Sequence, residues 1–212
     1  MDSFVMFLQL LGTVAFAVSG AVVGLRKRMD ILGVIVLGLT TAVGGGITRD
    51  IMLGITPPAI FSDPLTVSVA AITSVVVFLL ACRQKLMQTG RVYELTMLWS
   101  DSLGLGIFTV IGAQTAMTIL PESSWMTVAF LGTVTGVGGG VWRDIMAGEL
   151  PYVFTKHIYA CAALIGAFVW EITRLWNPEL ALLIGGGTVC LIRLLAAHYR
   201  WSLPKVKDFE VK

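Results

Sequence analysis

Charge is scarce in this sequence. Only 13% of the 212 residues are Asp, Glu, Lys or Arg, whereas 56% are hydrophobic. A chain with so few charged side chains cannot cover a water-facing surface, and the composition is typical of an integral membrane protein. The net charge is only +2, and the basic residues are spread over many segments. Because nucleic-acid binding needs clustered positive charge, the sequence gives it little support.

Cysteine pairs and catalytic motifs are also lacking. Cys82, Cys161 and Cys190 are odd in number and show no C-x-x-C or Cys/His spacing, so neither a disulfide framework nor a zinc site is expected. The chain has no Gly-x-Ser-x-Gly, phosphate-loop or His-Glu-x-x-His motif. Asp50 and Asp144 make a poor catalytic carboxylate pair, because each has an arginine beside it. We therefore expect no enzyme and no cofactor.

Long apolar runs follow one another along the chain, and a bilayer core requires about 20 apolar residues in a helix. Seven segments meet or approach this length: Phe4 to Leu25, Ile31 to about Leu53, Pro64 to Cys82, Val92 to Leu120, Trp125 to about Ala147, His157 to Trp170, and Leu180 to Ala197. The sixth is short unless residues 155–173 extend it. The sequence thus predicts an all-α integral membrane protein with seven transmembrane helices in a single domain, residues 1–212, ending in a short tail at 200–212.

Basic residues orient the seven predicted spans, because short cytoplasmic loops retain Lys and Arg. Eleven of the fifteen basic residues then lie on one side: Arg26, Lys27, Arg28, Arg83, Lys85, Arg91, Lys156, Arg200, Lys205, Lys207 and Lys212. The opposite side has only Arg174 in a loop, while Arg49, Arg143 and Arg193 fall within or at the ends of spans. We therefore expect the N-terminus outside the cell and the C-terminus in the cytoplasm.

An eleven-residue segment occurs twice. Gly44–Gly54 reads GGGITRDIMLG, and 94 positions later Gly138–Gly148 reads GGGVWRDIMAG. Weaker matches flank it: Gly12, Phe16, Gly20 and Ala21 match Gly104, Phe108, Gly112 and Ala113 at an offset of 92, and Pro58 and Phe61 match Pro151 and Phe154 at 93. Two repeats of three spans, about 3–84 and 91–174, follow. Because three is odd, the second enters the membrane from the opposite face as an inverted repeat, and a seventh helix at 178–199 stands outside it.

Small residues at every fourth position predict that spans two and five pack closely against other helices. One stripe contains Gly38, Ala42, Gly46, Asp50 and Gly54, and the other contains Gly132, Gly136, Gly140, Asp144 and Gly148. The triplets 44–46 and 138–140 add three successive residues of low helix propensity. They predict either a kink alone or a local unwinding whose carbonyl oxygens face an ion path. On the pathway hypothesis, a leucine at Gly45 or Gly139 abolishes permeation and leaves assembly intact.

Charged residues inside a bilayer are costly, and the first interpretation of each is functional. Helical spacing of four aligns a hydroxyl, a glycine and a guanidinium in each repeat: Thr41, Gly45 and Arg49, then Thr135, Gly139 and Arg143. Either these residues line a polar path, or each unit, Arg49–Asp50 and Arg143–Asp144, is a structural clamp whose partner the sequence does not name. Asp101 has no equivalent in the first span, where we expect Leu or Gly. It either pairs with Arg193, attracts cations, or titrates as part of a proton relay, and we favour the first two.

The paired GGG-x-x-RD-x-M-x-G segments, in a three-plus-three arrangement with a seventh helix, resemble the prokaryotic relatives of the trimeric intracellular cation (TRIC) channels. The same bacterial sequences are also labelled glycine transporter domain proteins. The resemblance implies a homotrimer in the lipid bilayer, one potassium-permeable path per protomer, and kinked second and fifth helices that line it. By the resemblance, the kinks would be Gly44, Gly45, Gly46, Gly138, Gly139 and Gly140, and their charged neighbours would be Arg49, Asp50, Arg143 and Asp144. Thr41 and Thr135, from their spacing, and Asp101, from its place inside a span, complete the predicted path residues. The Lys-Glu-Val lipid-associated motif of animal members is absent at the second triplet.

Three hypotheses follow. The leading one is a passive, potassium-permeable monovalent cation channel of a bacterial inner membrane. The alternative is a secondary transporter of glycine or a similar small zwitterion, since inverted repeats also build transporters. The third is a membrane scaffold in which the glycine seams only pack helices. A hydrated path favours the channel, an occluded pocket the transporter, and fully bonded Arg-Asp units without a cavity the scaffold.

Overall fold

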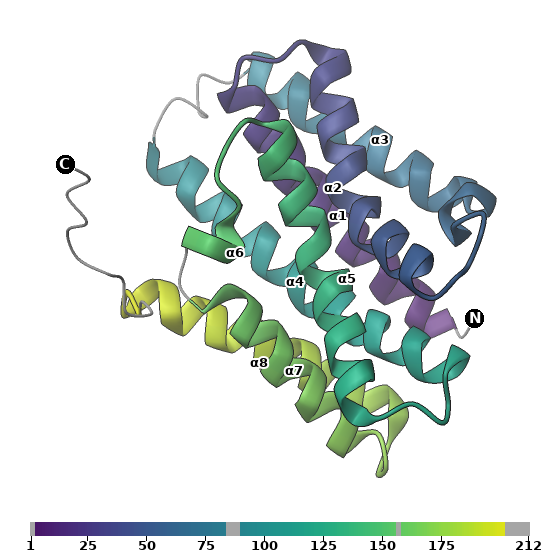
Figure 1. Ribbon diagram of the computed structural model, residues 1–212. Helices are drawn as coiled ribbons and strands as arrows, with labels where there is room; N and C mark the ends of the chain where they lie inside the picture. Colours follow the sequence, from purple (N-terminus) through teal and green to yellow (C-terminus); the bar gives the residue numbers. More distant parts are fainter. Residues whose placement is uncertain (1–2, 84–89, 156–157, 202–212) are drawn as a thin grey trace, which may run out of the picture.

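The structure is a computed structural model that describes residues 3–83, 90–155 and 158–201. Within these ranges every regular element is helical (Figure 1). The elements are α1 (Ser3–Arg26), α2 (Ile31–Met52), the 3₁₀ helix η1 (Ala59–Ser62), α3 (Pro64–Arg83), α4 (Gly90–Ile119), α5 (Trp125–Met146), α6 (Tyr152–Thr155), α7 (Tyr159–Thr173) and α8 (Pro178–His198). The prediction of an all-α protein is confirmed.

Several of these helices are suited to a lipid environment. In the described part of the chain α1, α2, α3, α4 and α8 are long and apolar enough to cross a membrane. α5 equals α2 in length, with 22 residues each, and α7 is a shorter apolar helix of 15 residues. Large apolar side chains lie exposed on the bundle, among them Phe7, Ile72, Leu79 and Phe130. Such a surface matches lipid better than water, and the chain is a membrane protein with transmembrane helices.

The two glycine-rich helices begin and end in the same way. Asp30 caps the start of α2 and Ser124 caps the start of α5, each accepting a hydrogen bond from a backbone N–H of the first turn. Gly54 and Gly148 follow the last turns with φ of +74° and +66°. Glycine adopts this left-handed conformation without the steric cost of a Cβ. The final glycine of each eleven-residue segment is therefore a helix stop.

Two groups of three helices pack around a shared centre (Figure 1). α1, α2 and α3 contact one another, and so do α4, α5 and α7. The groups meet where α2 contacts α5 and where α1 contacts α4, while α8 packs against α4 and α7. In Figure 1, α1 begins on the right of the bundle and α8 ends on the left, so these two ends lie on opposite sides.

α2 and α5 cross antiparallel, with backbone against backbone. A Cβ at Gly45 would overlap the carbonyl oxygen of Thr135, and a Cβ at Gly139 would overlap that of Thr41. Moving forward by one turn along α2 therefore moves back by one turn along α5. Gly45 matches Gly139 and Thr41 matches Thr135 at the offset of 94, so each contact is the counterpart of the other, as a local two-fold relation requires. Only glycine permits so close an approach.

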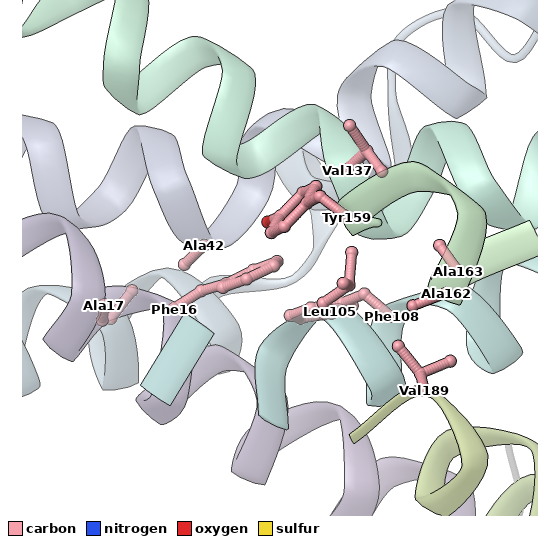
Figure 2. Packing of buried hydrophobic residues seen from close by; sticks show 11 residues of the cluster. Phe16, Ala17, Ala42, Leu105, Phe108, Val137, Tyr159, Ala162, Ala163 and Val189 are labelled. Atoms are coloured by element: carbon pink, nitrogen blue, oxygen red, sulfur yellow. The ribbon is translucent and has the colours of Figure 1, made fainter. Parts of the chain in front are cut away.

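The same reciprocity holds between α1 and α4. Gly12 lies against Phe108, and Gly104 lies against Phe16. The two rings stack on each other with centroids 5.3 Å apart. Figure 2 shows them in one buried cluster with Tyr159. The aromatic pair therefore occupies the centre of the molecule, where the two groups of helices meet.

Two expectations need correction. Both glycine triplets are regular helix inside unbroken α2 and α5, so the backbone does not unwind there. The close crossing of the two helices offsets the low helix propensity of glycine with packing that a side chain would prevent. The sixth long helix begins at Tyr159, after Ile158 in a left-handed conformation (φ 45°), and the separate turn α6 precedes it. His157, the expected start, lies outside the described residues.

Candidate functional site

Each Arg-Asp unit closes on itself and holds the segment that follows its helix. Arg49 donates from Nε (2.9 Å) and Nη2 (2.7 Å) to Oδ1 of Asp50. Arg143 donates from Nε to Oδ1 of Asp144 at 2.8 Å. The other oxygen of Asp50 accepts the first backbone N–H of η1 (2.9 Å), and that of Asp144 accepts the first of α6 (2.8 Å). Both units are therefore structural clamps, as one of the two interpretations of the sequence predicted.

The unit of α5 has a further set of partners and is fully buried. Arg143 Nη1 donates to Asp101 Oδ1 at 2.6 Å and to the hydroxyl of Ser19. Arg193 Nη2 lies 3.7 Å from the second oxygen of Asp101, and the Arg143 guanidinium lies 5.3 Å from the ring centre of Tyr152. The side chains of Arg143 and Asp101 are 0% and 1% exposed. Pairing with Arg193, one of the alternatives that the sequence left open for Asp101, is thus present, and Arg143 is the nearer partner.

The unit of α2 opens into a cavity instead. Among the described residues, Arg49 has beyond Asp50 one long contact, with Thr115 (Nη1 to Oγ1, 3.5 Å), and its side chain is 12% exposed. It lines a half-open cavity of about 600 Å³ between α1, α2, η1, α3 and α4. The other lining residues are Val5, Gln9, Ala42, Val43, Gly46, Asp50, Ala59, Ile60, Asp63, Thr66, Phe108, Ile111, Gln114, Thr115, Thr118 and Ile119. Apolar walls thus carry a few hydroxyl, amide and carboxylate groups.

A change at two positions explains this difference. At the offset of 92 that relates α1 to α4, Ser19 corresponds to Ile111 and Asp101 corresponds to Gln9. The two groups that bind Arg143 are therefore missing around Arg49. Gln9 instead donates to Asp63 (3.1 Å) and to the hydroxyl of Thr66 (3.1 Å). The expectation of Leu or Gly opposite Asp101 is wrong, because the matching residue of α1 is a glutamine.

The Phe16–Phe108 pair separates the cavity from a buried polar group of side chains, called the buried cluster below, which consists of Arg143, Asp144, Asp101, Ser19 and Arg193. Along α4, Thr115 lies in the cavity, Phe108 forms its inner end and stacks on Phe16, and Asp101 belongs to the cluster. Asp101, Phe108 and Thr115 follow one another at intervals of seven positions, and each interval is about 10 Å along a helix. Polar groups therefore lie on both sides of one apolar layer.

The predicted path residues divide into three sets. Gly46, Arg49 and Asp50 line the cavity. Gly140, Arg143, Asp144 and Asp101 lie in or beside the buried cluster. The third set packs helices: Gly45, Gly138 and Gly139 form the crossing, Gly44 lies against Trp142, and Thr41 and Thr135 are buried with hydroxyls bonded to their own helices. In this structure the third set does not line the cavity.

The sequence did not single out six polar residues that line the cavity: Gln9, Asp63, Thr66, Gln114, Thr115 and Thr118. Gln9 carries a usable signal, since it is an amide inside an apolar span and aligns with Asp101. Asp63 precedes a proline in a short connection and looks like an ordinary helix-start residue, so its place in the cavity depends on the tertiary fold.

The fold and the paired Arg-Asp units define a class of polytopic helical membrane proteins built from two matched groups of helices. The family model described as "Glycine transporter" matches residues 6–81 and 98–174, which follow the two groups closely. The chain belongs to this family, and its sequence and fold place it among the prokaryotic TRIC proteins. A UPF0126 membrane protein of Deinococcus radiodurans is 38% identical over 201 residues, covering 93% of this chain and 90% of the relative. The inner membrane protein YadS of Escherichia coli K12 is 36% identical over 204 residues, covering 94% and 95%.

Solved structures of TRIC channels share the fold over nearly the whole chain. A prokaryotic TRIC channel crystallised in 0.5 M KCl superposes with a TM-score of 0.87 at 32% identity, covering 96% of this chain and all of the other. The TRIC orthologue from Rhodobacter sphaeroides gives 0.84 at 32% identity, covering 94% and 100%. A structure determined to explain conductance through TRIC cation channels gives 0.81 at 37% identity, covering 95% and 97%.

Proposed function

We propose that this protein is a passive, potassium-permeable monovalent cation channel with a conduction path inside each protomer. The observation that carries the proposal is the half-open cavity, which reaches from one end of the bundle to Arg49 and Asp50 beside the α2–α5 crossing. The proteins of the same fold described as TRIC cation channels support it. Oxygen-bearing side chains in a largely apolar cavity can replace part of the water around a cation without holding it tightly.

The path would run through three layers in order. A cation enters the cavity, reaches the Phe16–Phe108 pair, and leaves through the region that the Arg143–Asp101 cluster now fills. An apolar constriction of stacked rings excludes water and ions unless it widens. The polar residues named above as path residues would act on either side of it, and the glycine helices α2 and α5 would line it at their crossing. The described conformation corresponds to a closed state of this path.

The membrane arrangement belongs to the same proposal. Seven spans, α1 to α5 with α7 and α8, form two inverted groups of three with α8 added, in a single transmembrane domain. The basic residues of the α1–α2 connection, Arg26, Lys27 and Arg28, face the cytoplasm, and the cavity then opens to the outside. The protein lies in the cell inner membrane with the N-terminus outside and the C-terminus in the cytoplasm, as a homotrimer, in line with the trimeric orthologue.

Two other hypotheses are less well supported. A glycine transporter would bind a zwitterion in an occluded site, but the cavity is open and its arginine is already engaged by Asp50. A scaffold would need no cavity beside its glycine seam. The transporter is therefore kept only as an alternative outcome of the test below.

Current through the purified protein in a planar bilayer tests the proposal. Under a KCl gradient we expect discrete steps that reverse near the potassium potential and do not change when glycine is added. A silent bilayer, together with saturable glycine uptake by proteoliposomes, would overturn the channel and favour the transporter.

A matched pair of leucine variants connects that current to the cavity. A Cβ at Gly46 points toward the cavity and would meet only Arg49 Nη2, at 3.9 Å. Gly46→Leu should therefore fold and obstruct the path, reducing the single-channel current several-fold. Gly187 of the third glycine triplet has open space around its Cβ position, so Gly187→Leu should leave the current unchanged. Equal currents in both variants would place the path elsewhere.

A further inference from the structure

Asp63 stands at the rim of the cavity and is held in a fixed position. Its carboxylate accepts Gln9 Nε2 (3.1 Å) and the Thr66 hydroxyl (2.6 Å) on Oδ2, and the Thr66 backbone N–H (3.1 Å) on Oδ1. Asp63 is partly buried, whereas its neighbours Ser62 and Pro64 are exposed. Hydrogen bonds from two helices thus fix the carboxylate where the cavity meets the outside.

The charge at this rim is not balanced by the rest of the cavity. The lining contains one cation, Arg49, and two carboxylates, Asp50 and Asp63. Arg49 forms an ion pair with Asp50, whereas Asp63 has no ion pair with any described residue. Neutral amide and hydroxyl donors bind Asp63 without cancelling its charge. The cavity therefore carries one net negative charge, placed at its opening.

We propose that Asp63 is the residue that concentrates partly hydrated monovalent cations at the open end of the path and excludes anions there. This inference rests on the proposed channel function and adds a selectivity determinant that the sequence motifs do not contain. Apolar walls focus the field of a fixed charge into the space in front of it. A unit charge acting at about 6 Å in water changes the local cation concentration about threefold.

In the aligned sequence of the second repeat, the residue that corresponds to Asp63 is basic. At the offset of 93 that relates Pro58 to Pro151, Asp63 corresponds to Lys156, and Thr66 corresponds to Tyr159. The acidic rim is therefore specific to the group of helices that holds the open cavity. The informative substitutions are therefore those that neutralise the charge of Asp63 or reverse it, as the lysine at the matching position does.

Asp63→Asn is the primary variant, because asparagine also caps helix starts and can keep the bond from the Thr66 backbone. In 0.1 M KCl we expect the single-channel conductance to fall about threefold, more for current entering through the cavity than for current leaving by it. The cation-to-anion permeability ratio should fall as well. In 1 M KCl, where the screening length is about 3 Å, the two proteins should conduct equally. Asp63→Lys should lower the conductance in 0.1 M KCl about tenfold.

Glu122 supplies the matched control. It is exposed in the α4–α5 connection, on the face of the bundle from which α1 starts, and it lies outside the cavity lining. Glu122→Gln removes the same charge and should leave the conductance unchanged. An Asp63→Asn conductance equal to wild type in 0.1 M KCl, or one lowered equally in 0.1 M and 1 M KCl, overturns the inference. A wild-type protein without current contradicts the channel itself, which is a separate result.

Discussion

The two groups of helices use the same Arg-Asp unit in opposite surroundings. Arg143 has Asp144, Asp101 and Ser19 around it and is completely buried, while Arg49 has Asp50 and one long contact and faces a cavity. The backbone contacts at the centre are reciprocal, but the polar partners are not. A local two-fold arrangement of helices therefore coexists with one sealed end and one open end.

This comparison separates what builds the fold from what distinguishes its two ends. Glycines at matching positions create the crossing and are equivalent in both groups. Two positions on α1 and α4 decide whether the guanidinium is enclosed: they hold Ser19 and Asp101 in one case, and Ile111 and Gln9 in the other. The asymmetry therefore depends on side chains of α1 and α4 that are not part of the repeated motif.

The largest expected effect comes from the equivalent glycines. Alanine at Gly45 or at Gly139 would place a Cβ in the carbonyl oxygen of the partner helix, so each variant should fail to give monodisperse protein in size-exclusion chromatography. The leucine test proposed from the sequence, with assembly intact, is therefore wrong for both positions. Gly46→Ala, in the same triplet, should remain monodisperse. Normal elution of only one of the two variants would show that the crossing is not reciprocal.

The next largest effect, a loss of unfolding free energy, is expected when Arg143 loses the carboxylate of Asp101. Asp101→Gln gives α4 the residue that α1 has at the matching position, and it leaves Arg143 with the carboxylate of Asp144 and the hydroxyl of Ser19. Removing a partner from a buried ion pair costs about 3–5 kcal/mol of unfolding free energy. Thermal unfolding in detergent measures it, with the exposed change Glu122→Gln as the control at about 0.5 kcal/mol or less. Equal stability of the two variants would mean that Asp101 does not stabilise the cluster.

The hydroxyl partners of the two arginines should differ in the same sense. Ser19→Ala removes a buried acceptor from Arg143 and should destabilise the protein by about 1–3 kcal/mol. Thr115→Val removes a 3.5 Å contact from partly exposed Arg49 and should change stability by about 0.5 kcal/mol or less. Chemical denaturation in mixed micelles compares them, and a larger loss for Thr115→Val would reverse the assignment of open and sealed ends.

A smaller loss than that of an ion-pair partner is expected for the aromatic pair, where the two groups of helices meet. Phe16→Leu and Phe108→Leu should each cost about 1–2 kcal/mol, from the lost ring stacking and imperfect refilling. The double variant should cost less than the sum, because both single variants remove the same ring contact. A double-mutant cycle on thermal unfolding measures the difference, and strict additivity would mean that the rings do not interact.

The sequence predicted the repeated parts of the molecule well. The long apolar runs indicated the long helices and their order, and the periodic small residues indicated the close packing of α2 against α5, because close backbone packing demands glycine at fixed spacing. Gly54 and Gly148, which the sequence placed in the packing stripes, instead follow the ends of the helices in the left-handed conformation. The turns η1 and α6 were missed, since each is a short segment whose first N–H is fixed by an aspartate oxygen that a linear pattern does not reveal.

The candidate site was less predictable. The sequence selected Arg49 and Arg143 as equals, yet their surroundings depend on residues about 60 to 120 positions away in the chain. A local sequence motif does not identify partners that are so distant in the chain. Gln9 is the exception, because alignment of the two repeats places it opposite Asp101. Asp63 enters the cavity only through the packing of α3 against α1, which no local pattern encodes.

The positions of these partners in the sequence also determine when each arginine can be neutralised during synthesis of the chain. Arg49 finds its carboxylate in the next residue, and Asp50 finds its second partner within ten residues, at the start of η1. The first group of helices can therefore enter the membrane with this charge already neutralised, before α5 exists. Arg143 needs Ser19 and Asp101, and both precede it in the chain. During N-to-C synthesis the arginine with distant partners emerges only after those partners are present.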